Sequence, residues 1–245
     1  MILFSDFDKT LYFREDDEKT KRNFDAIKKW KEKGNQFCIV TGRSYKSITE
    51  HSPETKNLCD YFIVDSGSII TSKTGEILKA FFFDDRIVKG IIELSRTLPE
   101  IPIAYYYSPN SEGVDMEPEN TTKLRLWFKD INLLENVVRR IRNSFPVFAF
   151  RSDPVVQSHN DLIGCNAFVE IIPIELGKGN AIRILLDQLN ISPSDAITVG
   201  DGLNDYGMVQ NFDGYAIENS ELATKFKSLR VTSSISSLIN DLEER

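Results

Sequence analysis

Two aspartates, two positions apart, follow an apolar run at the start of the chain. The run is Ile2–Ser5, and Asp6 and Asp8 come next, within residues 4–11. Side chains alternate in direction along a strand, so both carboxylates would lie on one side if the strand continued. Two close carboxylates repel each other and need a counter-charge, which a magnesium ion supplies. The pattern therefore predicts a metal site, with a solvated loop as the alternative.

A second pair of aspartates lies among glycines later in the chain. Asp201 and Asp205 belong to residues 200–205, which follow the apolar run Ala196–Val199. Glycine permits tight turns at the end of a buried strand. Ligands bind at the carboxyl ends of the strands in an open α/β sheet, so these carboxylates are candidates for the same site. A turn with capping aspartates is the alternative interpretation.

Two further segments are suited to bind an anion. In residues 37–44, Thr41 ends an apolar run and Gly42 lets the backbone approach a ligand. Backbone amides at the start of the next helix could then hold an anion. Lys178 stands between two glycines at the head of a helical pattern, where a lysine acts as a point charge on phosphate. Taken singly, each segment is also compatible with an ordinary turn and helix start.

The elements that would position these side chains alternate along the chain. Short apolar runs that end in polar or glycine-rich turns are typical of strands buried on both faces of a parallel sheet. Between them, Phe24, Ile27 and Trp30 share one face of a helix that ends at Gly34, and a comparable pattern spans residues 181–189. The predicted strands are Ile2–Ser5, Phe37–Val40, Tyr61–Val64, Ala196–Val199 and Tyr215–Ile217. This alternation predicts an α/β fold built from βαβ units.

The middle of the chain follows another pattern. Its predicted elements are a helix at 85–98, strands at 103–107 and 124–128, a helix at 133–143, and strands at 147–151 and 167–172. A helix followed by two strands, twice over, indicates a separate α+β module. We therefore expect a core formed by residues 1–83 and 168–245, with an inserted module of αββαββ pattern at residues 84–167.

Composition limits the class of partner. The chain has 245 residues, with 30 lysines plus arginines against 37 aspartates plus glutamates, a formal net charge of −7. The 41% hydrophobic and 27% charged residues exclude collagen-like, coiled-coil and disordered classes. The acidic balance argues against nucleic acid or an anionic membrane as the main partner, because both favour a basic surface. A small phosphorylated metabolite remains compatible with the acidic net charge, since its binding depends on the charge near the site. The sequence does not decide between a monomer and a homodimer.

Cysteine usage and the start of the chain indicate a compartment. The three cysteines, Cys38, Cys59 and Cys165, are far apart in apolar surroundings, and no pair has zinc-ligand spacing. We expect three buried thiols in a reducing compartment. The first residues carry no basic region, and every apolar run is shorter than a membrane span requires. These features predict a cytoplasmic protein.

Taken together, the motifs resemble those of the haloacid dehalogenase superfamily of phosphotransferases. The order is an Asp-x-Asp pair, a threonine, a lysine and a Gly-Asp-x-x-Asn-Asp stretch, all between Asp6 and Asp205. The long interval from Thr41 to Lys178 is where members with a large cap insert it. The αββαββ module resembles the cap of the Cof-type, sucrose-phosphatase and phosphoglycolate-phosphatase branch. Residues 65–70 loosely match an Asn-Gly-Ala stretch of those relatives. The resemblance implies a Rossmann-like catalytic core and a cap that sets specificity.

The resemblance also implies a role for each matched residue. Asp6 would be the nucleophile that forms an aspartyl-phosphate, and Asp8 the general acid and base. Lys178 would pair with Asp6 and the phosphoryl group. The residues expected to hold Mg²⁺ are Asp6, Asp8 through its main-chain carbonyl, Asp201 and Asp205, the last directly, through water, or by supporting the groups that bind the ion. The residues expected to bind phosphate are Thr41, Gly42, Lys178 and Asn204.

One position departs from the family pattern. Lys9 stands where the family usually has glycine after the second aspartate. Lysine disfavours a positive φ, so either φ is negative here or the loop tolerates strain. Asp8-Lys9-Thr10 alone also matches the Asp-Lys-Thr of ion-pumping ATPases, which would make Asp8 the nucleophile. We favour Asp6, because it directly follows the strand.

Substrate choice is expected to depend on the cap. The predicted substrate residues are Lys123, Arg125, Arg151, His159 and Asn160 in the module, and Arg43 after the threonine turn. Arg125 lies within a strand-like run and Arg151 at the end of one, so either could reach the core site. A solvated surface charge is the alternative for the cap residues, and helix packing is the alternative for Arg43.

The resulting hypothesis is a magnesium-dependent phosphatase that acts through an aspartyl-phosphate. Its substrate would be a small phosphorylated metabolite of the sugar-phosphate or phosphoglycolate type. A phosphomutase is an alternative, since one branch of the superfamily shares this cap type. A non-catalytic regulatory protein that binds phosphorylated metabolites is a second alternative, which the sequence disfavours because every expected catalytic position is filled.

Overall fold

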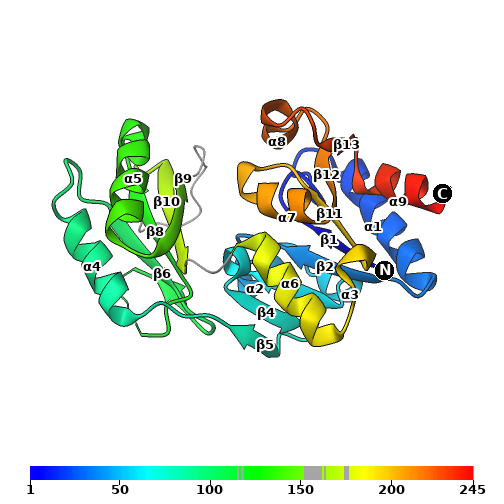
Figure 1. Ribbon diagram of the computed structural model, residues 1–245, viewed down its shortest axis with the longest axis horizontal. Coiled ribbons are helices and arrows are strands. Elements are labelled where there is room, and N and C mark those ends of the chain that lie inside the picture. The colour runs from blue at the N-terminus through cyan, green and yellow to red at the C-terminus, as the bar shows by residue number, and fades with distance from the viewer. Residues whose placement is uncertain (115, 117–118, 152–161, 163, 174–176, 245) are drawn as a thin grey trace. The chain divides into compact units, whose positions relative to one another are not determined.

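The structure is a computed structural model that describes residues 1–114, 116, 119–151, 162, 164–173 and 177–244. It divides into two compact units (Figure 1). The first unit comprises Met1–Lys79 and Gly177–Arg245, and the second comprises Ala80–Leu176. The second unit is thus inserted into the first.

An eight-stranded sheet forms the centre of the first unit. Its strands are β1 (Ile2–Ser5), β2 (Gln36–Val40), β3 (Tyr61–Val64), β4 (Ile69–Ser72), β5 (Ile77–Ala80), β11 (Ala196–Gly200), β12 (Asp213–Ile217) and β13 (Arg230–Thr232). They are ordered β13-β12-β11-β1-β2-β3-β4-β5, and neighbours from β13 to β3 are parallel. The predicted α/β fold with a Rossmann-like parallel sheet is confirmed.

The chain changes direction across this sheet at β1. From β1 it passes to β2 and β3 on one side, and it later returns to β11, β12 and β13 on the other. In an open parallel sheet, ligands bind beyond the carboxyl ends of the strands where this change occurs. The segments that follow β1, β2 and β11 all start at this edge.

Helices complete the first unit. They are α1 (Asp17–Glu32), α2 (Tyr45–His51), α3 (Thr55–Leu58), α6 (Lys178–Leu189), α7 (Tyr206–Asn211), α8 (Glu221–Lys225) and α9 (Ile235–Glu243), with 3-10 turns at Asp65–Gly67, Pro193–Asp195 and Leu203–Asp205. The predicted apolar face of α1 is buried, and the chain after it turns at Gly34 with φ 82°. Residues of α6 and α7 share one buried apolar cluster with Ile2 and Phe4 of β1. Figure 1 shows both helices beside the central sheet.

Within its described residues, the second unit contains a five-stranded sheet and the two α-helices α4 and α5. Its elements are α4 (Asp85–Ser95), β6 (Ile103–Tyr107), β7 (Glu112–Gly113), β8 (Lys123–Phe128), a 3-10 turn (Ile131–Leu133), α5 (Leu134–Ser144), β9 (Val147–Arg151) and β10 (Ala167–Pro173). The sheet order is β7-β6-β8-β10-β9, and its paired strands are antiparallel. This matches the predicted αββαββ pattern with one addition, the two-residue strand β7.

The two faces of this second sheet differ in chemistry. Leu124, Leu126 and Phe128 of β8 face the helices and share a buried apolar cluster with α4 and α5. The intervening positions on β8 point the other way, where Trp127 joins an aromatic cluster that includes Tyr107. Strand periodicity of two therefore separates an apolar core from an aromatic and basic face.

The unit boundaries differ from residues 84 and 168. Strand β10 pairs with both β8 and β9, so its residues belong to the second sheet as far as Pro173. At the other end, Phe83 is buried in the cluster beneath α4 and donates its backbone N–H to the carbonyl of Thr121. The second unit is therefore longer than residues 84–167 at both ends.

Sequence reasoning overlooked β4, β5 and β13, and the last two lie at the edges of the first sheet. All residues of β5 except its last are exposed, and Val231 of β13 is 54% exposed, so neither strand carries a buried apolar run. The three cysteines are buried and unpaired with one another, as expected. Within the described part of the chain, no helix combines the length and apolar character that a membrane crossing requires.

Candidate active site

Asp6 continues β1 beyond its last assigned residue. Its backbone N–H donates to the carbonyl of Val199 in β11, 3.0 Å away, so the sheet holds the backbone in place. The residue is 7% exposed. Burial raises the pKa of this carboxyl well above its ordinary value, Lys178 lowers it, and Asp205 and Asp201 raise it further.

Lys178 supplies the positive charge at this edge. It is the first residue of α6, follows Gly177 in a left-handed conformation (φ 132°), and is 3% exposed. Its Nζ lies 2.5 Å from Asp6 Oδ1 and 2.5 Å from Asp205 Oδ1. Burial alone lowers the pKa of this ammonium, but the two carboxylates raise it above the ordinary value. The predicted pairing of Lys178 with Asp6 is present.

Asp205 folds back on the turn that follows β11. Its Oδ2 accepts hydrogen bonds from the backbone N–H groups of Asp201 and Gly202, at 3.0 and 2.9 Å. This return requires Gly200, because a Cβ at position 200 would lie 2.5 Å from the Cβ of Asp205. The glycines of this motif therefore let the side chain of Asp205 come close to the backbone of the turn. This contact fixes the carboxylate of Asp205 beside Lys178.

Asp201 faces the same cluster and has a partner that sequence reasoning missed. The hydroxyl of Thr10 donates to Asp201 Oδ1 at 2.9 Å. Burial raises the pKa of Asp201 to about 6, with Asp205 adding to the rise and Thr10, Lys178 and Lys9 opposing it. The missed signal was the position of Thr10, two residues after the second aspartate of the first motif.

Three carboxylates meet closely enough to share one cation. Oxygens of Asp6, Asp201 and Asp205 all lie within 4.8 Å of one another. All donors are hard oxygens, which suits Mg²⁺. Mutual repulsion among these buried groups is what a divalent cation would relieve, so the residues present fit the predicted ion. The side chain of Asp8 is outside this cluster, and its predicted contribution is the main-chain carbonyl.

Asp8 is instead held by Arg43. The guanidinium Nε and Nη2 of Arg43 donate to the two carboxylate oxygens of Asp8, at 2.7 and 2.6 Å. Such a two-point contact fixes the plane of the carboxylate as well as its position. Arg43, predicted to contact substrate or to pack against a helix, lies in the first unit and positions the expected acid and base.

The turn around Thr41 is fixed by the loop after β3. Thr41 is buried at the end of β2, and its hydroxyl accepts from the N–H of Arg43 at 3.1 Å. Asp65 and Ser66 both have positive φ (49° and 59°) and donate their N–H groups to the carbonyls of Arg43 and Thr41. Thr41 and Gly42 therefore lie at the predicted edge of the sheet. Asn204 is exposed on the turn after β11.

Lys9 adopts the second of the two conformations considered for it. Its φ is 60°, and its N–H donates to the carbonyl of Tyr12 at 2.8 Å. The left-handed region costs a residue with a Cβ about 1–2 kcal/mol, which glycine avoids. Lys9 therefore keeps the loop geometry that glycine usually provides, with strain.

Comparison with known proteins identifies the family. Residues 3–237 match the family described as haloacid dehalogenase-like hydrolase. The chain belongs to this family. An uncharacterised protein of Mycoplasma capricolum is 30% identical over 233 residues, which cover 86% of this chain and 87% of that protein. The resemblance inferred from the four motifs is confirmed.

Solved structures share the haloacid dehalogenase-like fold. A family member from Bacillus subtilis has a TM-score of 0.79 at 15% identity, covering 99% of this chain and 98% of that one. A phosphatase of the superfamily from Bacteroides thetaiotaomicron has a TM-score of 0.77 at 19% identity, covering 99% and 94%. A sugar phosphatase of subclass IIB has a TM-score of 0.76 at 16% identity, covering 99% and 98%.

The predicted substrate residues of the second unit have distinct environments. Arg125 is bonded to the buried carboxylate of Glu170 (Nε to Oε2, 2.7 Å) and to the hydroxyl of Tyr107. Lys123 is fully buried with its ammonium 3.7 Å from the ring centroid of Tyr107. Arg151 is exposed, 3.3 Å from a carboxylate oxygen of Glu135. Their contact with substrate stays a prediction, and His159 and Asn160 lie outside the described residues.

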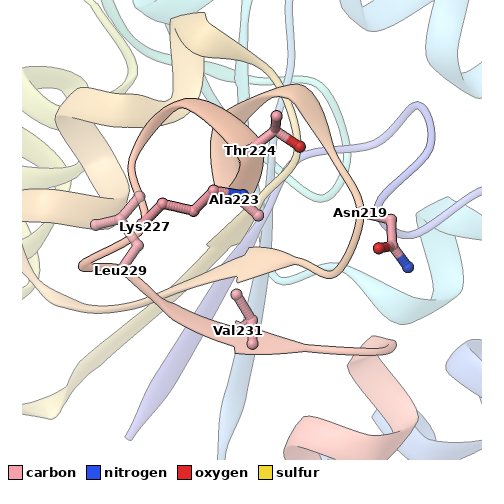
Figure 2. Close-up of a pocket in the computed structure, with 6 residues that line it drawn as sticks. All are labelled: Asn219, Ala223, Thr224, Lys227, Leu229 and Val231. Atoms are coloured by element: carbon pink, nitrogen blue, oxygen red, sulfur yellow. The ribbon is translucent and has the colours of Figure 1, made fainter.

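Figure 2 shows a pocket elsewhere in this hydrolase. Its lining residues are Asn219, Ala223, Thr224, Lys227, Leu229 and Val231, from α8, β13 and the adjoining loops. None of these residues is one of the predicted catalytic or phosphate-binding side chains. The carboxylate cluster, not this pocket, is the candidate active site.

Replacing Arg43 by alanine is expected to lower kcat by about 10- to 100-fold, because Asp8 loses the contact that orients it. Arg43→Lys should recover little, since an ammonium cannot contact both oxygens in the same way. Steady-state kinetics with p-nitrophenyl phosphate measures both variants. Equal kcat in all three proteins would show that Asp8 needs no such positioning.

Proposed function

We propose that this hydrolase is a magnesium-dependent phosphatase that acts on a small phosphorylated metabolite through an aspartyl-phosphate on Asp6. The observation that carries the proposal is the surroundings of Asp6, a buried carboxylate 2.5 Å from the Lys178 ammonium and clustered with Asp201 and Asp205. A carboxylate that attacks a phosphate dianion needs positive charge beside it. The names of two solved neighbours, a phosphatase and a sugar phosphatase, support the same reaction class.

The carboxylates of Asp6, Asp201 and Asp205, with the main-chain carbonyl of Asp8, would hold Mg²⁺. When bound, the ion neutralises phosphoryl oxygens and orients them for in-line attack. Lys178 and the backbone amides of the turn after β11 keep Asp205 in place for this task. Thr10 does the same for Asp201 through its hydroxyl.

The first transfer joins Asp6 to phosphorus. As the bond from the Asp6 carboxylate to phosphorus forms, the bond from phosphorus to the ester oxygen breaks. Asp8 donates its proton to that oxygen, so the alcohol leaves uncharged. Lys178, Thr41 and the amide of Gly42 stabilise the charge on the phosphoryl oxygens.

The second transfer returns the enzyme to its starting state. Asp8, now a carboxylate, takes a proton from the water that attacks phosphorus. The bond between phosphorus and Asp6 breaks, inorganic phosphate leaves, and Asp8 is again protonated. Arg43 keeps the carboxylate of Asp8 in position between the two steps through its two hydrogen bonds.

Removal of the metal tests the proposal at the level of the reaction. A panel of sugar phosphates, phosphoglycolate and p-nitrophenyl phosphate is assayed for released phosphate with Mg²⁺, with excess EDTA, and after Mg²⁺ is restored. We expect release with Mg²⁺, loss of nearly all activity in EDTA, and full recovery. Activity that survives EDTA would contradict the metal role. Conversion of a hexose 1-phosphate to the 6-phosphate without released phosphate would instead identify a mutase.

Arg125 and Arg151 provide a matched pair in the second unit. Arg125→Ala removes the ion pair with the carboxylate of Glu170, which is 2% exposed as a residue, and this costs about 3–5 kcal/mol. We expect the melting temperature to fall by about 10 °C. Arg151→Ala removes an exposed pair and should change it by less than about 2 °C. Equal melting temperatures for both variants would contradict a structural role for Arg125, which thermal unfolding monitored by circular dichroism can establish.

A further inference from the structure

Lys9 lies between Asp8 and Thr10, and the side chains of both make contacts at the candidate active site. Asp8 before it binds Arg43, and Thr10 after it donates to Asp201. Lys9 itself is exposed, whereas Asp6 is 7% and Thr10 0% exposed. The side chain of Lys9 therefore begins at the solvent side of the loop that carries the nucleophile.

The conformation of Lys9 argues that its side chain has a use. A φ of 60° strains lysine, and glycine would adopt it without strain. Strained residues of this kind cluster at sites where the strain supports a function. The hydrogen bond from the Lys9 N–H to Tyr12 explains the loop shape but makes no use of the side chain.

The ammonium of Lys9 differs from the other cations of the site. Arg43 is bonded to Asp8, and Lys178 is bonded to Asp6 and Asp205. Among the residues that the structure describes, no carboxylate oxygen lies within 4 Å of the Lys9 ammonium. Its charge nevertheless reaches the cluster, because it lowers the pKa of Asp201.

The other charges of the site balance without the positive charge of Lys9. When ionised, four aspartates face the two cations Lys178 and Arg43, and a divalent ion would cancel the remaining two negative charges. The donors assigned to the phosphoryl group, Lys178 and Thr41, are buried, so that group must lie deep beside Asp6. An exposed ammonium at the rim would meet the part of the substrate beyond the phosphoryl group.

We propose that Lys9 binds a second anionic group of the substrate, so that the preferred substrates are phosphate monoesters that also carry a carboxylate or another phosphate. This inference rests on the proposed phosphatase function and narrows its substrate class. It assigns to Lys9 a role in specificity, while bond making and breaking remain with Asp6 and Asp8.

Matched substrates with and without the second charge test the proposal. The carboxylate pair is 3-phosphoglycerate and glycerol 3-phosphate, and the phosphate pair is fructose 1,6-bisphosphate and fructose 6-phosphate. For each pair, the ratio of kcat/KM values is measured in the wild type, Lys9→Met and Lys9→Arg. We expect the ratio to fall about three- to fivefold in Lys9→Met and to be largely retained in Lys9→Arg.

A fall for the carboxylate pair alone or for the phosphate pair alone identifies the second anion. Higher ionic strength should lower the ratio in the wild type and change it little in Lys9→Met. Ratios unchanged by Lys9→Met in both pairs overturn the proposal and leave Lys9 as a solvated surface charge.

Binding separates this inference from the proposed function. Calorimetric dissociation constants for 3-phosphoglycerate and glycerol 3-phosphate are compared in Asp6→Asn and in Asp6→Asn/Lys9→Met, both with Mg²⁺. The proposal predicts a weakening for 3-phosphoglycerate about three- to fivefold larger than for glycerol 3-phosphate. If the wild type releases no phosphate, the phosphatase function fails, but the same comparison still decides the role of Lys9.

Thermal unfolding checks that the variants fold. Lys9→Gly should raise the melting temperature by about 2 °C, because glycine adopts the positive φ without strain. Lys9→Met should melt near the wild type. A lower selectivity ratio in Lys9→Met without a lower melting temperature assigns the effect to the charge.

Discussion

Asp6→Asn is expected to reduce phosphate release by about 10³-fold or more, because an amide cannot replace the attacking carboxylate. Asparagine has nearly the same size, and Lys178 keeps its hydrogen bond to Asp205. The variant should therefore fold as the wild type does. Initial rates with p-nitrophenyl phosphate and Mg²⁺ measure the loss, and circular dichroism checks the fold.

Asp25→Asn is the matched control for this substitution. Asp25 lies on the exposed side of α1, where it pairs with Lys28. The same change of charge at this surface position should leave the rate within about twofold, since surface substitutions seldom matter. Near-normal turnover in Asp6→Asn would transfer the role of nucleophile to another group, with Asp8 the first candidate.

Lys178→Met is expected to show the second large effect, on both rate and stability. Without the ammonium, the buried carboxylates of Asp6 and Asp205 face each other without compensation. Breaking such a buried arrangement costs about 3–5 kcal/mol, which should lower the melting temperature by about 10 °C in EDTA. We expect kcat to fall at least about 100-fold, because the phosphoryl charge also loses its lysine.

Magnesium distinguishes an electrostatic cause from a packing defect. Added Mg²⁺ should raise the melting temperature of Lys178→Met more than that of the wild type, since the ion would replace the missing positive charge. Lys28→Met, at an exposed lysine, is the control and should melt like the wild type. A melting temperature of Lys178→Met that is equal to the wild type in EDTA would contradict the role assigned to this lysine.

The core strands were predictable because their environment is uniform. Strands β1, β2, β3 and β11 are buried on both faces, so each shows a continuous apolar run followed by a polar turn. Edge strands lack that signal, as β5 shows with its exposed leucine and isoleucine. The end of the inserted unit was misplaced for a related reason, because pairing partners of β10 cannot be read from its own residues.

The candidate site was predictable in its residue types but less so in its contacts. Spacing within one loop indicated Asp6 and Asp8, and alternation of strands brought Asp201 to the same edge. Contacts across the fold carried no local signal. The pairing of Arg43 with Asp8 joins residues 35 positions apart. The pairing of Arg125 with Glu170 depends on the register of β8 against β10.

Chemical trapping of the intermediate tests the central claim most directly. Borohydride reduces an acyl phosphate to an alcohol, so it converts a phosphorylated aspartate into homoserine. The wild-type protein is mixed with Mg²⁺ and a substrate that it turns over, quenched, reduced, and analysed by peptide mass spectrometry. We predict homoserine at position 6 only when substrate and Mg²⁺ are both present. Homoserine at position 8, or intact aspartate at position 6 during turnover, would contradict Asp6 as the nucleophile.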